Sequence, residues 1–356
     1  MKVTKKISLL VATLVMVVGL AACGSLDNSS MQSSTNNVTG KKNKKNNYQT
    51  TGSASGSYAG VIKNGKYVTS KSRGLTADQN GNVNNTKSFE SGLQDISKTV
   101  FPTSKYVFQE GQYLSSDTVQ NWIDRESKSN PDGLNPKDNG SKDAKKRNPI
   151  YLQALEEQDY MEKSGTSLKL KGVTIGLAMN SVDYYQKEQY GAQYETKISD
   201  ADIKAKSEEI AKKVLKRLRK KSAFKNIPIV IAVYKRASND SLVGGTFMRY
   251  SNNSGQKLEK WKNLDYKNVV YPISDTETSP NSNDSSAFDN FKTQVESFFP
   301  NLSGITAKAR YNGDSMEGMS VSITTQFYSE TEINSFTQFV STQAEKYLPS
   351  GVDTDI

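Results

Sequence analysis

The only cysteine of the chain, Cys23, ends an N-terminal segment that differs from everything after it. Three lysines precede an almost wholly apolar run, Ile7–Leu20, which is too short to cross a bilayer comfortably as a helix. A charged start, an apolar run and small residues before a cleavage point are typical of a bacterial secretion signal. The folded part must therefore come from the residues after Cys23, and it must form without disulfides.

The residues Leu20, Ala21 and Ala22, directly before Cys23, resemble a lipobox. In proteins with this motif, a signal peptidase cuts before the cysteine, and a diacylglyceryl group with fatty acids such as palmitate is attached to its sulfur. The sequence thus predicts a signal peptide over residues 1–22 and lipidation at Cys23. Two acyl chains hold a protein stably, so we expect a mature chain anchored to membrane lipid on the extracellular face of the cell membrane.

The composition excludes several kinds of chemistry. The chain has no histidine, and no free thiol remains once Cys23 carries lipid. Histidine-based triads, zinc sites built on His or Cys, and thiolate nucleophiles are therefore ruled out. The sequence also shows no calcium-loop spacing and no phosphate loop. We expect no metal, no cofactor and no enzymatic activity in the folded part.

Charge gives a weaker indication of partners. Loss of residues 1–22 removes three lysines, so the formal net charge falls from +10 to +7 (10 − 3). The sequence contains one run of basic residues at the expected end of a helix, and it has two explanations. The run can be a solvated helix end that complements the helix dipole, or it can dock to anionic envelope polymers or lipid. Export argues against nucleic acid. The run comprises Lys212, Lys213, Lys216, Arg217, Arg219, Lys220 and Lys221.

Residues 23–57 are predicted to be a lipidated N-terminus and a disordered tether. After the cysteine, this stretch is dominated by Ser, Asn, Thr, Gly and Lys, and it cannot bury enough apolar surface to fold. We expect the fold to begin near Tyr58. Shortly afterwards, Asn64-Gly65 lies between short apolar runs and predicts a tight hairpin turn.

Two later stretches follow the same plan. Each begins with a helix whose apolar face ends at a Phe-Pro pair, continues with a strand, and closes with a second, alternating strand and a helix capped by serine. Ser199 and Ser329 are the predicted caps. The apolar positions expected to form the core are Leu93, Ile96, Phe291, Val295, Ile210, Val214, Phe336 and Val340.

The pattern predicts an α+β fold of two related helix–strand–strand–helix modules with mostly antiparallel sheets. The first module covers residues 58–274 and holds an insertion, Ser115–Ser167, between its strands. It also contains an additional strand pair, Pro228–Tyr234 and Thr246–Tyr250. The second module covers residues 287–356.

One aromatic cluster is a candidate ligand groove. Asp183 lies beside Tyr184 and Tyr185, with Tyr190 close behind. Aromatic faces stack on sugars and carboxylates accept their hydrogen bonds, so these four residues are suited to a sugar or peptide. A tyrosine-rich loop that covers a sheet edge is the alternative.

Several blocks of sequence are distinctive. They are Asn148–Leu152, Glu157–Tyr160, Gly172–Val182, Ile227–Lys235 and Asp240–Val243. Together they resemble the CamS family of sex-pheromone-precursor lipoproteins of Gram-positive bacteria, over essentially the whole mature domain.

The resemblance implies a surface lipoprotein whose signal-peptide tail is trimmed to a short apolar mating pheromone. On this chain the peptide would be Met16-Val17-Val18-Gly19-Leu20-Ala21-Ala22. Gly19 stands where the family's peptides carry a bulky residue, and Asp183 stands where an aromatic residue is expected.

The mature domain is then interpreted as a binding or interaction module of the cell envelope. Two alternatives remain open. A carboxylate-based envelope hydrolase requires two acids that face one cleft. A solute-binding lipoprotein requires two lobes around a closed pocket.

Overall fold

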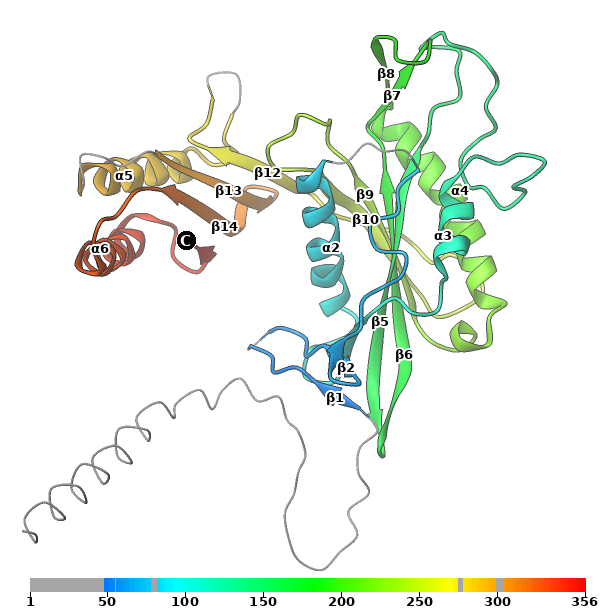
Figure 1. The fold of residues 1–356 in the computed structure, drawn as a ribbon, viewed down its shortest axis with the longest axis horizontal. Coiled ribbons are helices and arrows are strands. Elements are labelled where there is room, and N and C mark those ends of the chain that lie inside the picture. The colour runs from blue at the N-terminus through cyan, green and yellow to red at the C-terminus, as the bar shows by residue number, and fades with distance from the viewer. Residues whose placement is uncertain (1–47, 55, 78–81, 275–277, 299–303) are drawn as a thin grey trace, which may run out of the picture.

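Two sheets with helices packed on them form the body of the molecule (Figure 1). The computed structural model describes residues 48–54, 56–77, 82–274, 278–298 and 304–356. The larger sheet has the strand order β11-β10-β9-β6-β5-β4 and the smaller one β12-β13-β14-β15. The strands of the larger sheet are β4 (Val107–Glu110), β5 (Leu152–Ser164), β6 (Ser167–Met179), β9 (Ile229–Lys235), β10 (Thr246–Asn253) and β11 (Lys262–Asn263).

A long hairpin, β5 and β6, forms the middle of the larger sheet. Each strand has 13 residues, and Gly165 turns the chain between them with a φ of 61°. The helix α4 (Asp200–Arg219) joins β6 to β9, which lies parallel to β6. The other neighbouring strands of this sheet are antiparallel.

Helices cover both faces of the larger sheet. On one side, α4 and α3 (Ser116–Ile123) share a core with every second residue of β6, and on the other side α2 (Val83–Lys98) packs through Phe89 and Leu93 (Figure 1). Gly176 permits the close approach of α2, because a Cβ there would lie 2.6 Å from the Phe89 ring. The residues of β6 in the α4 core are Val173, Ile175, Leu177 and Met179.

The smaller sheet carries its two helices on one face. Its strands are β12 (Tyr266–Tyr271), β13 (Gly304–Asn312), β14 (Ser315–Thr324) and β15 (Asp353–Asp355), and its helices are α5 (Ser282–Phe298) and α6 (Glu330–Tyr347). Both helices and the sheet share a single apolar core. β15 lies parallel to β14, and the other pairs are antiparallel. The predicted α+β class with mostly antiparallel sheets is confirmed.

Local sequence signals are confirmed at the helix starts and in the core. The Ser199 hydroxyl accepts the Asp202 N–H (3.1 Å), and the Ser329 hydroxyl accepts the Glu332 N–H (3.2 Å). Glu332 in turn accepts the N–H of Tyr328 (2.8 Å), the residue directly before the serine cap. All eight predicted core residues are buried, none with more than 6% of its surface exposed: Leu93, Ile96, Phe291, Val295, Ile210, Val214, Phe336 and Val340.

The two modules share the order of their elements but differ in arrangement. In the first, α2 and α4 lie on opposite faces of the sheet, and β4 pairs with β5 rather than with β6. In the second, β13 pairs directly with β14. The predicted insertion, Ser115–Ser167, contains β5, a central strand. Its apolar alternation is interrupted by the polar run Glu156–Asp159, which hides it in the sequence.

The predicted limits of the modules also differ from the structure. β12 falls in the segment assigned to the first module, residues 58–274, yet it pairs with β13 of the smaller sheet. The second unit therefore includes β12 from Tyr266 rather than beginning at residue 287, and α5 already begins at Ser282.

The fold also begins before Tyr58, inside the predicted tether of residues 23–57. The short strand β1 (Gln49–Thr50) pairs with β2 (Val61–Lys63), which forms a hairpin with β3 (Lys66–Tyr67). Backbone pairing holds β1, and composition does not reveal such pairing. The predicted signal peptide, residues 1–22, and Cys23 lie outside the described residues.

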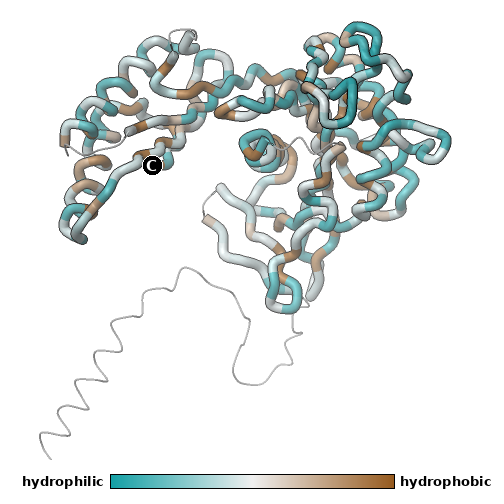
Figure 2. Tube along the Cα trace, turned by 45° about the horizontal axis from the view of Figure 1, so that its top comes forward, coloured by the Kyte–Doolittle hydropathy of each residue, from teal (hydrophilic) through white to brown (hydrophobic). Residues whose placement is uncertain are grey.

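None of the helices within the described ranges is both long enough and apolar enough to cross a membrane. Figure 2 shows hydrophobic and hydrophilic residues interleaved along both parts of the molecule, as expected where each element buries only one face.

Candidate functional site

Asp183, one residue of the predicted groove, has a structural role. It is buried in the hairpin of β7 (Val182–Gln186) and β8 (Gln193–Lys197), where it accepts hydrogen bonds from the Arg147 guanidinium and from the Ile150 N–H (3.0 Å). Burial raises the pKa of Asp183, and the bond from Arg147 opposes the shift. The same guanidinium lies 4.0 Å from the ring centre of Tyr185. This contact ties the loop before β5 to the hairpin.

The other tyrosines of the predicted groove point elsewhere. Tyr184 lies on the opposite face of β7, where its hydroxyl accepts the Asn239 N–H (3.3 Å). Tyr190 is 90% exposed, at a backbone φ of 62° in the hairpin turn. The structure thus places Asp183, Tyr184, Tyr185 and Tyr190 on one hairpin but does not gather them around a shared cavity.

Several basic side chains at the end of α4 already bind other groups of the chain. Lys212 pairs with Glu208 (2.6 Å) and Lys213 with Glu209 (3.0 Å). Arg219 is buried and donates hydrogen bonds to four backbone carbonyl groups between residues 224 and 255, so it holds the helix end in place. Within this basic run, Lys216, Lys220 and Lys221 are exposed and form no ion pair with the described residues.

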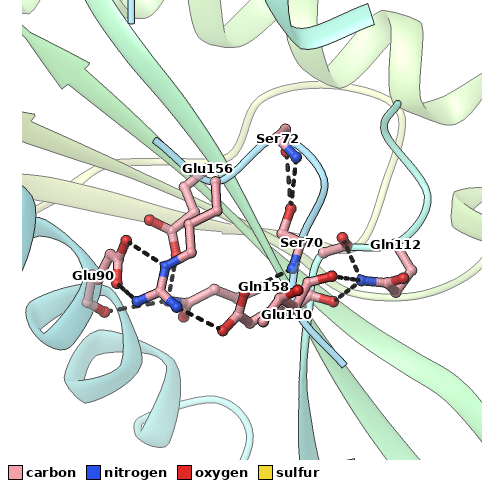
Figure 3. A network of polar contacts seen from close by, with 10 residues as sticks. Ser70, Ser72, Glu90, Glu110, Gln112, Glu156 and Gln158 are labelled. Carbon is pink, nitrogen blue, oxygen red and sulfur yellow. Dashed lines mark hydrogen bonds and ion pairs between the residues drawn. The ribbon is translucent and has the colours of Figure 1, made fainter. Parts of the chain in front are cut away.

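A cavity of about 250 Å³ between α2, β4 and β5 gathers acidic side chains that the sequence did not single out. Glu90 comes from α2, Glu110 from the end of β4, and Glu156 from β5 (Figure 3). Arg73 reaches the cavity from the loop after β3. Tyr67, Ser70, Gln94, Phe108 and Gln158 complete the lining.

Arg73 connects two of the three carboxylates. Its guanidinium donates two hydrogen bonds to Glu90 (2.8 and 3.3 Å) and one to Glu110 (3.3 Å). Glu110 also accepts the Ser70 N–H at 2.7 Å. A planar guanidinium that bridges two carboxylates fixes their positions.

Glu156 is the carboxyl group that Arg73 does not reach through a hydrogen bond. It accepts a hydrogen bond from the Gln158 amide (3.1 Å), and that amide also donates to the Glu90 carbonyl (3.2 Å). Burial, followed by the nearby charge of Glu90, raises the pKa of Glu156 to about 8. At neutral pH Glu156 is therefore mostly protonated, and the cavity combines a half-buried proton donor with the carboxyl groups of Glu90 and Glu110.

The opposite face of β5 carries a second acidic pair, Glu157 and Asp159. Glu157 accepts the backbone N–H groups of Tyr113 and Leu114, at 3.2 and 2.8 Å, and Asp159 accepts that of Gln112 at 3.0 Å. Burial raises both pKa values, and mutual repulsion adds to the shift of Asp159. Because the pair lies against the loop after β4, it fastens that loop to the sheet.

The sequence does not indicate this cavity, because Arg73, Glu90 and Glu110 are distant from β5 along the chain. One signal was present. The run Glu156–Asp159 places polar residues on both faces of a strand that apolar positions flank. Burial of these groups destabilises the fold unless each of them has a hydrogen-bond partner. In the described part of the chain, no group of three or more His, Cys, Asp or Glu side chains has an arrangement that could hold a metal ion.

The fold and the cavity define a class, an α+β protein with two main sheets and an acidic cavity beneath α2. A sequence profile described as the CamS sex pheromone cAM373 precursor matches residues 67–356. The chain therefore belongs to the CamS sex pheromone cAM373 precursor family.

Solved structures agree with this assignment. The sex pheromone precursor from Lactobacillus salivarius subsp. salivarius UCC118 is 51% identical, with a TM-score of 0.81 over 86% of this chain and 90% of that chain. The C-terminal domain of the sex pheromone staph-cAM373 precursor from Staphylococcus aureus is 32% identical, with a TM-score of 0.66 over 75% of this chain and 86% of that chain. The curated proteins include no match.

Proposed function

We propose that this chain is a lipoprotein anchored on the outer face of the cell membrane through a diacylglyceryl group on Cys23. The lipobox before Cys23, together with membership of the precursor family, supports the proposal. A lipoprotein-processing signal peptidase is its first partner. Cys23→Ala should leave the precursor uncut and without lipid, because the chain has no other cysteine to accept it. Mass spectrometry of membrane-extracted protein tests this, and a mature N-terminus other than a lipidated Cys23 would contradict it.

The signal-peptide tail is the second part of the proposal. After cleavage before Cys23, a membrane protease releases Met16–Ala22, an uncharged apolar peptide that acts as a pheromone. Its affinity for a receptor would come from burial of Val17, Val18 and Leu20, at roughly 1.5–3 kcal/mol each.

Gly19 makes this peptide a weak signal. It buries nothing and adds backbone freedom that binding must restrict. Synthetic Met16–Ala22 should induce plasmid transfer in responder cells less strongly than a Gly19→Ile peptide. Equal or greater potency of the native peptide would refute the argument about Gly19. Culture supernatants without a peptide ending at Ala22 would refute the pheromone role of this chain.

The mature domain acts as a binding module, with the acidic cavity as its ligand site. The observation that carries this proposal is the geometry of the cavity, in which the Glu156 carboxyl group, with its raised pKa of about 8, lies beside the two carboxyl groups of Glu90 and Glu110 that Arg73 bridges. With Arg73 opposite two carboxylates, the cavity carries one net negative charge at neutral pH, which suits a neutral or cationic ligand with hydroxyl or amide groups. Amino sugars of the cell wall have this chemistry. Lys216, Lys220 and Lys221 would add contact with anionic envelope polymers.

A neutral oligomer of N-acetylglucosamine is a suitable probe, because it does not titrate itself. Calorimetry should show binding that weakens as pH rises through about 8, since Glu156 then loses its donor proton. Glu156→Gln should bind without this pH dependence. Glu162→Gln is the matched control, because Glu162 lies on the same strand but pairs with Lys105 outside the cavity. Absence of binding to the unmodified protein would contradict the proposal.

The same observation favours a second candidate, a carboxylate-based hydrolase of envelope polysaccharide. A neutral carboxyl group close to ionised ones is the arrangement that supplies a general acid and its partner. Release of reducing ends from the same oligomer separates the two candidates. A hydrolase would lose turnover but keep binding in Glu156→Gln, whereas a binding module shows no turnover in either protein.

A further inference from the structure

An apolar groove of about 780 Å³ lies in the second part of the molecule, between α6 and the C-terminal segment 348–356. It is separate from the acidic cavity. Ile356, which lines the groove, is 50% exposed. Apolar surface left open to water in a groove is typical of a docking surface. The main apolar lining residues are Ile323, Phe327, Val340, Leu348, Val352 and Ile356.

The strand beside this groove has an open edge. β14 pairs with β13 over its whole length, but it pairs with β15 only from Gly318 to Ser320. Within the described ranges, Val321–Thr324 thus have a strand partner on one side only, and Ile323 of this stretch lines the groove. Unpaired backbone groups on a strand edge accept an extended segment that adds a further strand.

The two features together specify the occupant. An acyl chain would fill an apolar groove but offers nothing to the backbone groups of β14. An extended apolar peptide satisfies both, with alternate side chains in the groove and its backbone on the strand edge. About four residues, or ~13 Å of strand, match the open edge.

We propose that this groove binds the signal-peptide tail of the chain itself, Met16–Ala22, as a strand added to Val321–Thr324. In an extended peptide, Met16, Val18, Leu20 and Ala22 lie on one side, and Val17, Gly19 and Ala21 lie on the other. The peptide has no charged side chain to desolvate. This inference rests on the proposed release of the tail, because the released peptide is the ligand. The anchored domain then binds a peptide that the same chain supplies.

Photo-crosslinking tests the inference. The mature lipoprotein in lipid nanodiscs is exposed to synthetic Met16–Ala22 that carries photoreactive leucine in place of Leu20, and mass spectrometry maps the adducts. We expect adducts on residues 321–324 and on α6. Ile356→Glu should lower labelling at least ~10-fold, whereas Ile333→Glu should retain it within about twofold. Both residues are about equally exposed, 50% and 47%, but Ile333 lies on α6 outside the groove.

Backbone methylation tests the added strand. Successive N–H groups of a strand point to opposite sides, so only one of Val17 and Val18 can donate to β14. One of the two singly N-methylated peptides should therefore lose labelling while the other keeps it. Equal labelling by both peptides, adducts on lipid alone, or a groove occupied by a second copy of the chain would overturn the inference. Peptide release is judged separately from culture supernatants, so the two proposals fail independently.

Discussion

At the scale of single residues, Glu156 links the acidic cavity to the stability of the fold. An unfolded glutamate loses its proton near pH ~4.3, but burial holds the pKa of Glu156 at about 8. Between these values the folded chain keeps a proton that the unfolded chain has lost. Unfolding thus releases a proton, and the free energy of unfolding falls as pH rises, by up to ~5 kcal/mol for this group.

Urea unfolding at pH 5 and pH 8 measures this dependence. In Glu156→Gln the urea midpoint should fall less between pH 5 and pH 8, because glutamine stays neutral. Part of the slope should remain, since the pKa values of Glu157 and Asp159 are raised as well. Glu162→Gln should show the same change of the urea midpoint with pH as the unmodified protein. A slope unchanged in Glu156→Gln would show that this side chain ionises normally in the fold.

Residue-level predictions from the sequence succeeded where the partner is close along the chain. The Ser199 and Ser329 caps bind N–H groups three residues ahead, and Asn64-Gly65 takes the two positive φ angles of its turn, 53° and 73°. Glu156 depends instead on a helix and on loops between 40 and 90 residues away in sequence. Its environment therefore follows only from the assembled sheet.

At the scale of elements, the contact between α2 and β6 depends on a glycine of β6, Gly176, which has no side chain. A Cβ on Gly176 would lie 2.6 Å from the Phe89 ring and 2.9 Å from Leu93. Gly176→Ala should push α2 away from the sheet and cost roughly 1–3 kcal/mol of unfolding free energy. Chemical unfolding provides the measurement. Gly318→Ala on β14 is the control, because its nearest neighbour would be 3.5 Å away, and an equal cost in both variants would contradict the packing argument.

Helix faces were predictable, but strand partners were not. Apolar spacing on a helix is fixed by residues three and four apart, so Leu93 and Phe336 were correctly assigned to the core. Strand pairing is fixed by contacts between distant segments. The limits predicted for the first module therefore include β12, which pairs with β13 of the smaller sheet, and the predicted insertion includes β5.

At the scale of the whole molecule, an ion pair connects the smaller sheet to α2, which packs on the larger sheet. Arg310 of β13 donates to Asp95 of α2 (2.7 Å), and its guanidinium also lies near the Tyr266 ring. Burial opposes ionisation of Asp95, but hydrogen bonds from Arg310 and Lys98 outweigh it and lower the pKa. The link should therefore persist through mildly acidic pH and weaken only as pH falls below the ordinary range of aspartate.

Because both side chains are about one-third exposed, the pair should contribute to orientation more than to stability. We expect Arg310→Ala to widen the distance distribution between spin labels at Lys128 in the first part and Thr342 on α6, both exposed, while the urea midpoint changes little. Lys98→Ala is the control, since it removes the neighbour of Asp95 on α2 but keeps the bond to Arg310. Equal broadening in both variants, or none in Arg310→Ala, would show that other contacts between the two parts, such as those of β10 with β12, set the orientation.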